Sequence, residues 1–389
     1  MWLRHLSLTH YRNYQRQEIG LCRGPVLLLG DNAQGKSNLL EAVFLLATTR
    51  AERASTDGDL IGWAALDEPQ PVARVMAQVE RLDGPLTLEV VIAARAARTR
   101  DGRITASKRL RVNGVARRQI DFVGQLTAVL FTTHDLELIG GPPAERRRYL
   151  DTTLSQLNRA YAQALQRYTK VITQRNALLR RIQEGAAEED ELSFWDDELA
   201  RDGALLMRER AAAAGVLARH ARDEHARVSG GTEELAIAYQ PRLDGWDGAR
   251  VQADDDSLAG ALRDQLASRR ARDIGAGQTL SGPHRDDLSC ALNGVAAASF
   301  ASRGQQRTAA LALRLAEARY LADGKGDLPV VLLDDVLSEL DEGRRHAVLE
   351  ALEGWDQLLI TSADADRFGE GLPAVAKVFH VREGTISEE

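Results

Sequence analysis

Residues 27–42, LLLGDNAQGKSNLLEA, contain the stretch that decides the fold of this chain. Gly30–Ser37 follows the pattern G-x-x-x-x-G-K-S, in which a glycine-rich turn directs backbone N–H groups around a polyphosphate. The flanking residues have the spacing of a buried strand and of a helix: Val26–Leu29 before the turn, and Leu39, Leu40, Val43, Phe44 and Ala47 after it. Because strand, turn and helix in this order are the context that the motif requires, the stretch predicts a nucleotide-binding P-loop rather than a chance glycine turn.

Each part of the motif has a predicted role at the phosphates. Lys36 brings a positive charge to the β- and γ-phosphates, and the Ser37 hydroxyl is a ligand for Mg²⁺. The helix that follows adds the positive end of its dipole at the same place. The residues expected to contact the nucleotide are Gly30, Asp31, Asn32, Ala33, Gln34, Gly35, Lys36, Ser37 and Asn38. The motif indicates a nucleotide but does not name the reaction.

Composition restricts the class of protein. The chain has 389 residues, of which 44% are hydrophobic and 28% charged, as expected for a soluble protein with more than one domain. No apolar run approaches the roughly 20 residues that a membrane helix needs, and the first residues lack the apolar core of a signal peptide. Cys22 and Cys290 form no disulfide or metal pattern. We therefore expect a cytoplasmic protein with no membrane partner.

The element pattern predicts an α/β fold that is split in sequence. Short strands precede Phe131, with a hairpin at Asn113-Gly114, and α/β segments return near the C-terminus. Between them, apolar residues at helical spacing predict an antiparallel helical hairpin with arms of about 33 residues, each reaching roughly 50 Å. We expect residues 1–135 plus 277–389 to form a nucleotide-binding head, and residues 136–276 to form an inserted helical lobe.

A second half of the site is predicted at Val330–Asp335, VVLLDD. Its apolar run is typical of a strand that is buried on both faces of a parallel sheet. Asp334 at the strand end is the expected Mg²⁺ ligand, and Asp335 is placed to orient or deprotonate the attacking water. An acidic strand end that only faces solvent is the alternative, which the P-loop makes less favourable. The predicted catalytic residues are thus Lys36 and Asp335.

The segment Ser302-Arg303-Gly304-Gln305-Gln306-Arg307 precedes a helix with an apolar side. A serine at such a position can be an ordinary helix N-cap. The helix start is also a potential phosphate site. Since the P-loop already holds the phosphates of its own chain, Ser302, Gly304 and Gln305 would contact a nucleotide that is held by a second chain.

Together these motifs resemble an ABC-type ATPase head, with Ser338–Asp341 at the position of its D-loop. More closely, the chain resembles the RecF family of recombination and repair proteins from end to end. The segments that carry this resemblance are LSLTHYRNY, LFTTHDLELIGGPPAERRRYLD, YTKVITQRNALLR, LSGPHRDDL and LLDDVLSELD. The resemblance implies that ATP joins two heads into a homodimer with weak DNA-stimulated ATPase activity. It also implies binding to duplex DNA and single-strand/double-strand junctions, and partners like RecR and RecO that help to load recombinase.

Three positions depart from the ABC pattern. Asp335 stands where most ABC proteins have a glutamate, and its shorter side chain predicts slow hydrolysis. Ser362 and Ala363 follow the strand LLIT, where a switch histidine is usual. Thr133-His134 lies where a Q-loop glutamine is expected. The residue that senses the γ-phosphate is therefore not identified by the motifs.

Two other functions fit part of the pattern. A nucleotide-binding subunit of an ABC transporter would also lack membrane helices, although the split head and the missing switch histidine argue against it. A P-loop protein with a purely structural role would leave Asp334 and Asp335 without a purpose. The helical arms are too short for Rad50 or for the chromosome-organising SMC proteins.

Candidate DNA contacts come from charge, because the net charge of −7 gives no global basic field. Residues 95–118 are strongly basic, and Arg109, Arg111 and Arg117 are the predicted DNA-binding residues; a solvated hairpin is the alternative. Arg146–Arg148 form a second cluster, which could bind DNA or brace the helical lobe against the head. Arg12 and Asn13 either lie over the nucleotide, as in similar heads, or form a surface turn.

Overall fold

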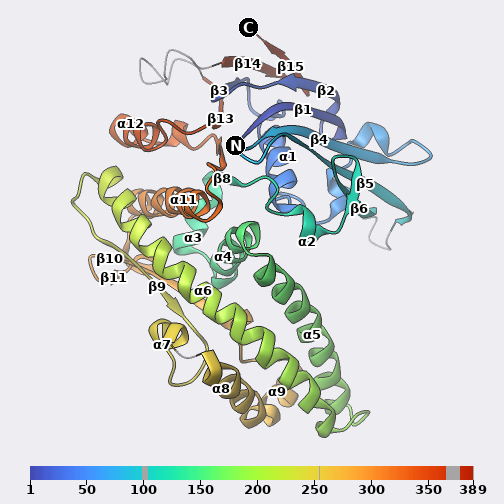
Figure 1. Cartoon of the computed structure of the whole chain (residues 1–389), viewed down its shortest axis with the longest axis vertical. Helices are drawn as coiled ribbons and strands as arrows, with labels where there is room; N and C mark the ends of the chain where they lie inside the picture. The colour runs from blue at the N-terminus through green and yellow to red at the C-terminus, as the bar shows by residue number, and fades with distance from the viewer. Residues whose placement is uncertain (99–103, 254, 365–376, 389) are drawn as a thin grey trace. The chain divides into compact units, whose positions relative to one another are not determined.

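The computed structural model describes residues 1–98, 104–253, 255–364 and 377–388. The chain forms two compact units, Met1–Asp135 with Glu317–Glu389 and Leu136–Ala316 (Figure 1). The first unit is thus formed by both ends of the chain and the second by the residues between them, as the split α/β pattern predicts. The boundary after Ala316 falls inside helix α11 (Arg303–Lys325). The division into a head of 1–135 plus 277–389 and a lobe of 136–276 remains a prediction.

The first unit contains a mostly parallel sheet that carries both nucleotide motifs. Its strand order is β15-β14-β3-β13-β12-β8, and only β15 is antiparallel to its neighbour. The strands are β3 (Gly24–Leu29), β8 (Ala128–Thr132), β12 (Val330–Asp334), β13 (Gln357–Ser362), β14 (Lys377–Arg382) and β15 (Thr385–Glu388). All five residues of β12 are buried, which confirms the predicted interior strand.

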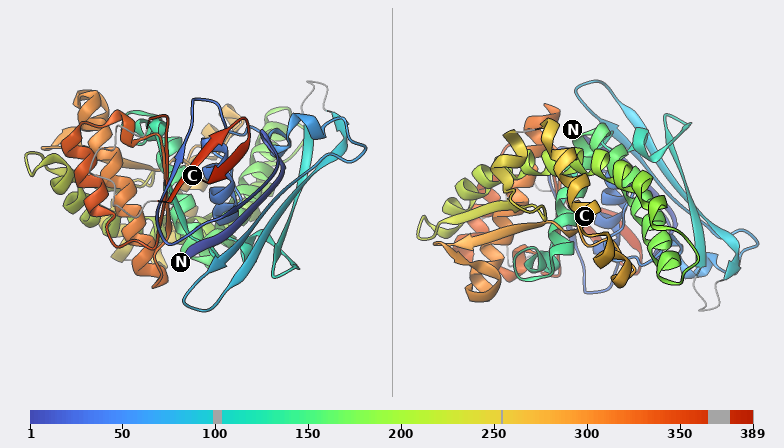
Figure 2. Two further views of the ribbon diagram at one scale, coloured as in Figure 1. Left: turned by 90° about the horizontal axis from the view of Figure 1, so that it is seen from above. Right: turned by 90° about the horizontal axis from the view of Figure 1, so that it is seen from below.

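A second, antiparallel sheet of the same unit has the order β2-β1-β4-β5-β6-β7. Its strands, drawn from dark blue to cyan in Figure 2, are β1 (Trp2–Tyr11), β2 (Tyr14–Gly20), β4 (Val72–Glu80), β5 (Leu86–Arg98), β6 (Ile104–Val112) and β7 (Val115–Arg117). The predicted hairpin at Asn113-Gly114 joins β6 to β7. Both turn residues have positive φ (51° and 77°), which suits Asn and Gly.

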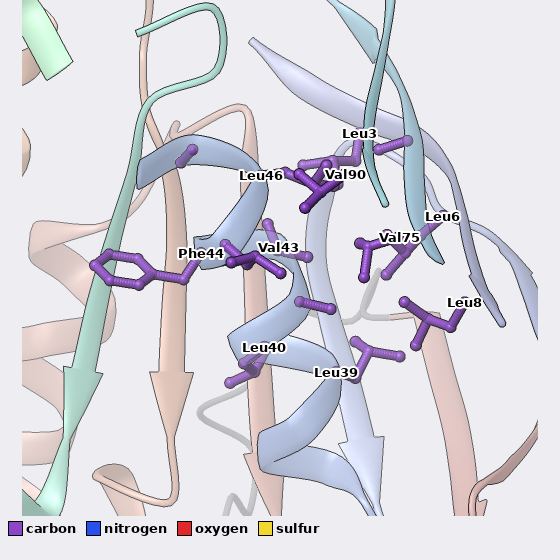
Figure 3. Packing of buried hydrophobic residues seen from close by; sticks show 14 of the residues in the cluster. Leu3, Leu6, Leu8, Leu39, Leu40, Val43, Phe44, Leu46, Val75 and Val90 are labelled. Carbon is purple, nitrogen blue, oxygen red and sulfur yellow. The ribbon is translucent and has the colours of Figure 1, made fainter. Parts of the chain in front are cut away.

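Helix α1 (Lys36–Thr48) packs between the two sheets and forms the centre of the core. Figure 3 shows its side chains Leu39, Val43 and Leu46 facing strand residues such as Leu8 and Val90. These residues are fully buried and belong to one continuous hydrophobic cluster. Because α1 begins at Lys36, inside the P-loop, this burial holds the loop rigidly on the sheet. The short helices α2 (Gln119–Phe122) and α12 (Glu342–Ala351) complete the unit.

The second unit is mainly helical. Its elements are α3 (Leu136–Gly140), α4 (Pro143–Leu157), α5 (Arg159–Gln183), α6 (Leu192–Ser229), α7 (Gly248–Ala253), α8 (Asp255–Ser268), α9 (Arg270–Ala276), α10 (Ala297–Phe300), most of α11, and the strands β9 (Leu235–Gln240), β10 (Asp287–Leu292) and β11 (Val295–Ala296). The strands form a small antiparallel sheet in the order β11-β10-β9. Helices α5 and α6 lie side by side, as the predicted hairpin requires (Figure 1).

The predicted equal arms of about 33 residues are wrong. The first arm breaks at Asn158, so α5 has 25 residues, whereas α6 has 38. Asn158 has extended backbone angles, and its side chain accepts the N–H of Tyr161 at 3.0 Å, so it caps a new helix. The apolar spacing continues across the break and therefore did not reveal it.

Buried ion pairs hold the helical unit together. Arg175 of α5 is 0% exposed and donates to Asp196 and Asp273, both at 2.8 Å. Arg146 of α4 binds Asp287 of β10 at 2.7 and 3.0 Å. Arg147 donates to the Asp286 carbonyl at 2.7 Å. Arg148 pairs with Glu145 at 3.3 Å. The cluster at 146–148 is therefore paired within this unit, and bracing of the helical lobe against the head remains a prediction.

In the described part of the chain, no helix has both the length and the apolar character needed to cross a membrane.

Candidate nucleotide site

Strand order brings the two nucleotide motifs together. Strand β13 lies between β3 and β12, and all three are parallel, so their carboxyl ends meet at one edge of the sheet. The register pairs Asp334 with Thr361, and Ser362 with Leu29, the residue before the P-loop. Ligands bind at this edge in open parallel sheets because the loops that follow the strands converge there.

The P-loop has the backbone conformation that its glycines predict. Gly30 and Gly35 have φ angles of 155° and 121°, and a Cβ on Gly30 would lie 2.2 Å from the Val381 carbonyl oxygen. A Cβ on Gly35 would approach Asn13 within 2.6 Å. Gly35 directly precedes α1, so the first N–H groups of that helix meet the loop without a capping side chain from this residue. These features make an anion site of the loop and helix start.

Lys36 is buried beside the carboxylates of Asp334 and Asp335. Its ammonium donates to the Gly30 carbonyl and to the Asp31 carbonyl, the latter at 2.8 Å. Burial lowers the pKa of Lys36, and the charges of Asp335 and Asp334 act against that shift. The lysine is thus held within reach of the loop rather than in solvent, as a phosphate ligand needs to be.

Asp334 joins the two halves of the site across 297 residues of sequence: the Ser37 hydroxyl donates to its Oδ1 at 2.7 Å. The Thr361 hydroxyl donates to the same oxygen at 3.0 Å, and Arg53 donates to Oδ2 at 2.6 Å. Two oxygens of the kind that Mg²⁺ prefers therefore lie side by side, which fits the predicted metal site. Together with residues 32–38 and Asp335, these side chains line a cavity of about 150 Å³.

Asp335 has a conformation that depends on its neighbours. Its φ is 56°, which is uncommon outside glycine, and its N–H donates to the Thr361 hydroxyl at 2.9 Å. The Ser338 hydroxyl donates to its carboxylate at 2.8 Å and to its carbonyl. The carboxylate therefore has a fixed direction at the cavity wall, as a group that orients water requires.

Replacement of Asp335 by Asn is expected to leave ATP binding intact and to slow hydrolysis by about 10²–10⁴-fold, the usual contribution of a general base. Asn tolerates the same positive φ and still accepts from Ser338, so the loop keeps its shape. Single-turnover hydrolysis with radiolabelled ATP measures the effect, and nucleotide affinity serves as the control. Wild-type turnover in this variant would assign water activation to another group.

Arg12 and Asn13 lie beside the P-loop but not as free surface residues. Arg12, with a φ of 55°, forms two bonds to Glu41 of α1 at 2.9 and 3.0 Å and one to the Asp59 carbonyl at 3.1 Å. Asn13 donates to the Gln34 carbonyl at 2.9 Å and accepts from Asn38 at 2.8 Å. The loop between β1 and β2 is therefore fastened to the P-loop and to α1, as a loop over the nucleotide would be.

A neighbouring cavity of about 420 Å³ contains residues that the sequence pattern missed. It is lined by Arg12, Asn13, Asn38 and the segment 61–65, in which Trp63 is 88% exposed. A tryptophan this exposed beside a phosphate loop offers a flat apolar surface. Arg53 and Thr361 were missed as well. Thr361 at a strand end was a weak signal, whereas nothing near Arg53 in sequence indicates that it reaches Asp334.

Ser302, Gly304 and Gln305 belong to the second unit, at the start of α11. Ser302 and Gln305 form a reciprocal cap: the Gln305 N–H donates to the Ser302 hydroxyl at 3.3 Å, and the Ser302 N–H donates to the Gln305 side chain at 2.7 Å. Gln305 also donates to Glu233 at 2.7 Å. The ordinary N-cap interpretation is thus confirmed, and a contact with a nucleotide of a second chain remains a prediction.

The three predicted DNA-binding arginines do not share one face. On β6, Arg109 and Arg111 alternate with Leu110, and the register pairs Leu110 with Arg117 of β7. Because paired residues point to the same side, Arg117 lies on the side of Leu110 and opposite to Arg109 and Arg111. Arg111 shares Glu89 with Arg74, at 3.2 and 2.5 Å. The positions of the three arginines in the sequence do not show which face of the β6–β7 hairpin each one occupies, because that depends on the strand register.

Comparison with known proteins matches this geometry to one family. The family model of the RecF/RecN/SMC N terminal domain matches residues 2–387. The DNA replication and repair protein RecF of Chloroflexus aggregans is 44% identical over 393 residues, which cover 99% of each chain. The solved structure of the recombination mediator protein RecF-ATPrS in the RecFOR pathway superimposes with a TM-score of 0.87 at 31% identity, covering 100% of this chain and 98% of that chain.

A more distant match concerns the fold alone. The Smc head domain of Pyrococcus furiosus aligns with 99% of this chain and 95% of its own, with a TM-score of 0.53 at 15% identity. The ABC-type ATPase fold with a helical insert is therefore shown for this chain.

Proposed function

The chain belongs to the RecF family, and on that premise we propose that it is an ATP-dependent DNA-binding protein of recombination and repair. In this proposal ATP joins two heads, the dimer binds duplex DNA and single-strand/double-strand junctions, and slow hydrolysis releases it. Partners similar to RecR and RecO would use the bound dimer to assist recombinase loading. The relatives named RecF and the RecFOR description of a similar structure support this assignment.

One observation carries the ATPase part of the proposal: the Ser37 hydroxyl lies 2.7 Å from Asp334, with Asp335 next in sequence. Ser37 and Asp334 would hold Mg²⁺, which would supply positive charge at the β- and γ-phosphates. Lys36 would contact the same phosphates, and Asp335 would orient water. Residues 30–38 would surround the polyphosphate with backbone N–H groups.

The base of ATP would lie in the cavity next to the P-loop. Trp63 offers a stacking surface there, and Arg12 and Asn13 form another part of its lining. Arg12 already donates to Glu41 and Asp59, so its contribution would come from the planar face of its guanidinium. Arg53, which binds Asp334, lines the same cavity as Lys36 and would contact the phosphates there.

The dimer would use the residues at the start of α11. Ser302, Gly304 and Gln305 would contact the nucleotide of the second chain, so residues 277–316 would act with the head in function. Arg109, Arg111 and Arg117 would contact DNA phosphates from both sides of the β6–β7 hairpin. The transporter subunit is not favoured, because a relative matched over the full length is a DNA replication and repair protein.

Measurement of size with and without ATP, and with and without DNA, tests the proposal. Light scattering should show a monomer alone, a dimer with ATP, and a dimer on a tailed duplex when ATP and DNA are both present. The tailed duplex should also raise the rate of hydrolysis. A chain that stays monomeric with ATP and gains no activity from DNA would overturn the proposed function.

A further inference from the structure

A large basic cavity lies in the first unit, outside the candidate nucleotide site. Its volume is about 820 Å³, and one acid, Asp57, lies among its cationic lining residues: Arg50, Lys108, Arg109, Arg111, Arg117 and Arg118. The lining of this cavity is therefore positively charged, although the whole chain carries a net charge of −7. Lys108 and Arg117 lie on the same side of the β6–β7 hairpin, and two cations side by side suit successive phosphates of a chain better than a single small anion.

The cations of this cavity differ in how far they are already paired. Arg111 binds Glu89 at 3.2 Å, and Arg118 binds Asp121 at 3.0 Å. Within the described part of the chain, no hydrogen bond or ion pair occupies the side chains of Arg109 and Arg117. Arg117, which lies on the same side of the hairpin as Lys108, is therefore available to an incoming phosphate without loss of an existing bond, whereas Arg109 points to the opposite side.

Lys108 differs from Arg109 and Arg117, because it already binds two residues of the segment that follows α1. Its side chain, 18% exposed, binds the Asp57 carboxylate at 2.7 Å and donates to the Thr49 carbonyl at 2.6 Å. Thr49 follows the last residue of α1 and has a φ of 59°. A cation at a helix C-terminus is favourable, so Lys108 stabilises this end of the P-loop helix.

The same segment returns to the nucleotide site between these two contacts. Arg53 donates to Asp334 at 2.6 Å, and its N–H donates to Glu41 of α1 at 3.1 Å. Residues 49–57 therefore contact Lys108 at both ends and Asp334 in the middle. Helix α1, of 13 residues, is a second and rigid connection between the P-loop and Thr49.

We propose that this cavity binds the phosphodiester backbone of DNA, and that residues 49–57 couple its occupancy to the nucleotide site, with Lys108 as the shared group. The inference rests on the proposed function, which supplies ATP and DNA as ligands. A backbone phosphate attracts Lys108 and repels Asp57, so it loosens the Lys108–Asp57 pair. Arg53 would lose part of its bond to Asp334 if that carboxylate held Mg²⁺, and the same segment would then shift from the other side. Coupling of this kind is reciprocal.

The variant Asp57→Asn tests the coupling. We measure the affinity of a tailed duplex by fluorescence anisotropy, with and without a non-hydrolysable ATP analogue. In the wild type the analogue should change the affinity by a factor within the usual range of roughly 5–150. In Asp57→Asn this factor should fall towards one, because Lys108 then has no carboxylate partner whose ion pair a DNA phosphate could loosen. A wild-type factor in this variant would overturn the coupling.

The variant Lys108→Gln tests the phosphate contact. Its affinity for the duplex should fall, and the slope of log affinity against log salt should lose about 0.9 because one contact disappears. Arg4→Gln, on β1 and outside the cavity lining, is the matched control with an unchanged slope. A slope in Lys108→Gln equal to the control would overturn the site. Inorganic polyphosphate with the same Lys108 dependence and the same coupling would overturn the assignment to DNA.

These outcomes separate the inference from the proposed function. A wild-type chain that binds no duplex, or whose binding ignores the ATP analogue, contradicts the proposed function itself. Coupling that is present in the wild type and retained in Asp57→Asn contradicts only the inference. Thermal melting of each variant confirms that it is folded.

Discussion

Replacement of Lys36 by Met is expected to abolish ATP-dependent dimer formation. The ammonium of Lys36 lies in the P-loop and bonds to the Asp31 carbonyl at 2.8 Å, next to the site for the β- and γ-phosphates. A hydrogen bond to a charged group contributes about 1.5–3 kcal/mol, so ATP affinity should fall roughly 10- to 150-fold. The dimer should be lost at ATP concentrations that saturate the wild type.

Methionine has nearly the length of lysine, so the change removes the charge with little change in packing. Lys170→Met on α5, at an exposed position of the other unit, is the matched control and should dimerise normally. Equilibrium dialysis measures ATP affinity, and light scattering measures dimer formation. Normal ATP-induced dimers in Lys36→Met would remove this residue from the site.

The parts of the site that sequence predicts are those built by local geometry. Gly30–Ser37 and Val330–Asp335 each combine a strand with the turn that follows it, and such units fold in the same way wherever they occur. Ser37 contacts Asp334 because β3, which precedes the P-loop, and β12, which ends at Asp334, are parallel strands of one sheet. In contrast, Arg53 reaches Asp334 through a loop without motif or periodicity, and only the folded chain shows that contact.

Elements of the fold show the same limit. The burial of β12 followed from its continuous apolar run, and the β6–β7 hairpin followed from Asn113-Gly114. The break at Asn158 did not, because the apolar seam continues across it while a single capping bond starts a new helix. The two faces of the basic hairpin depend on register, which residue spacing within one strand cannot supply.

The proposed site built from two chains is tested by Ser302→Arg, which should leave ATP binding by the monomer intact and block the dimer. The P-loop of the variant is unchanged, but a bulky cation would stand where the second chain's phosphate must fit. Ser302 also caps α11, so its loss costs about 1 kcal/mol of stability. Ser302→Asp is the matched variant: it can still cap the helix, and its charge should repel the phosphate. Both variants are therefore expected to remain monomeric with ATP, as light scattering can show.

A mixture of Ser302→Arg with Lys36→Met distinguishes a shared site from one within a single chain. In a heterodimer, one site carries both lesions, while the other combines the intact Lys36 of one chain with the intact Ser302 of its partner. Half of the sites are then complete, so the mixture should regain ATP-dependent dimers and DNA-stimulated hydrolysis that neither variant shows alone. If Ser302 acts within its own chain, no site is complete and no activity returns. Crosslinked heterodimers give the stronger form of the test, because they remove the need for one intact site to hold the pair together. Crosslinked pairs with no more activity than the sum of the two variants would contradict the composite site.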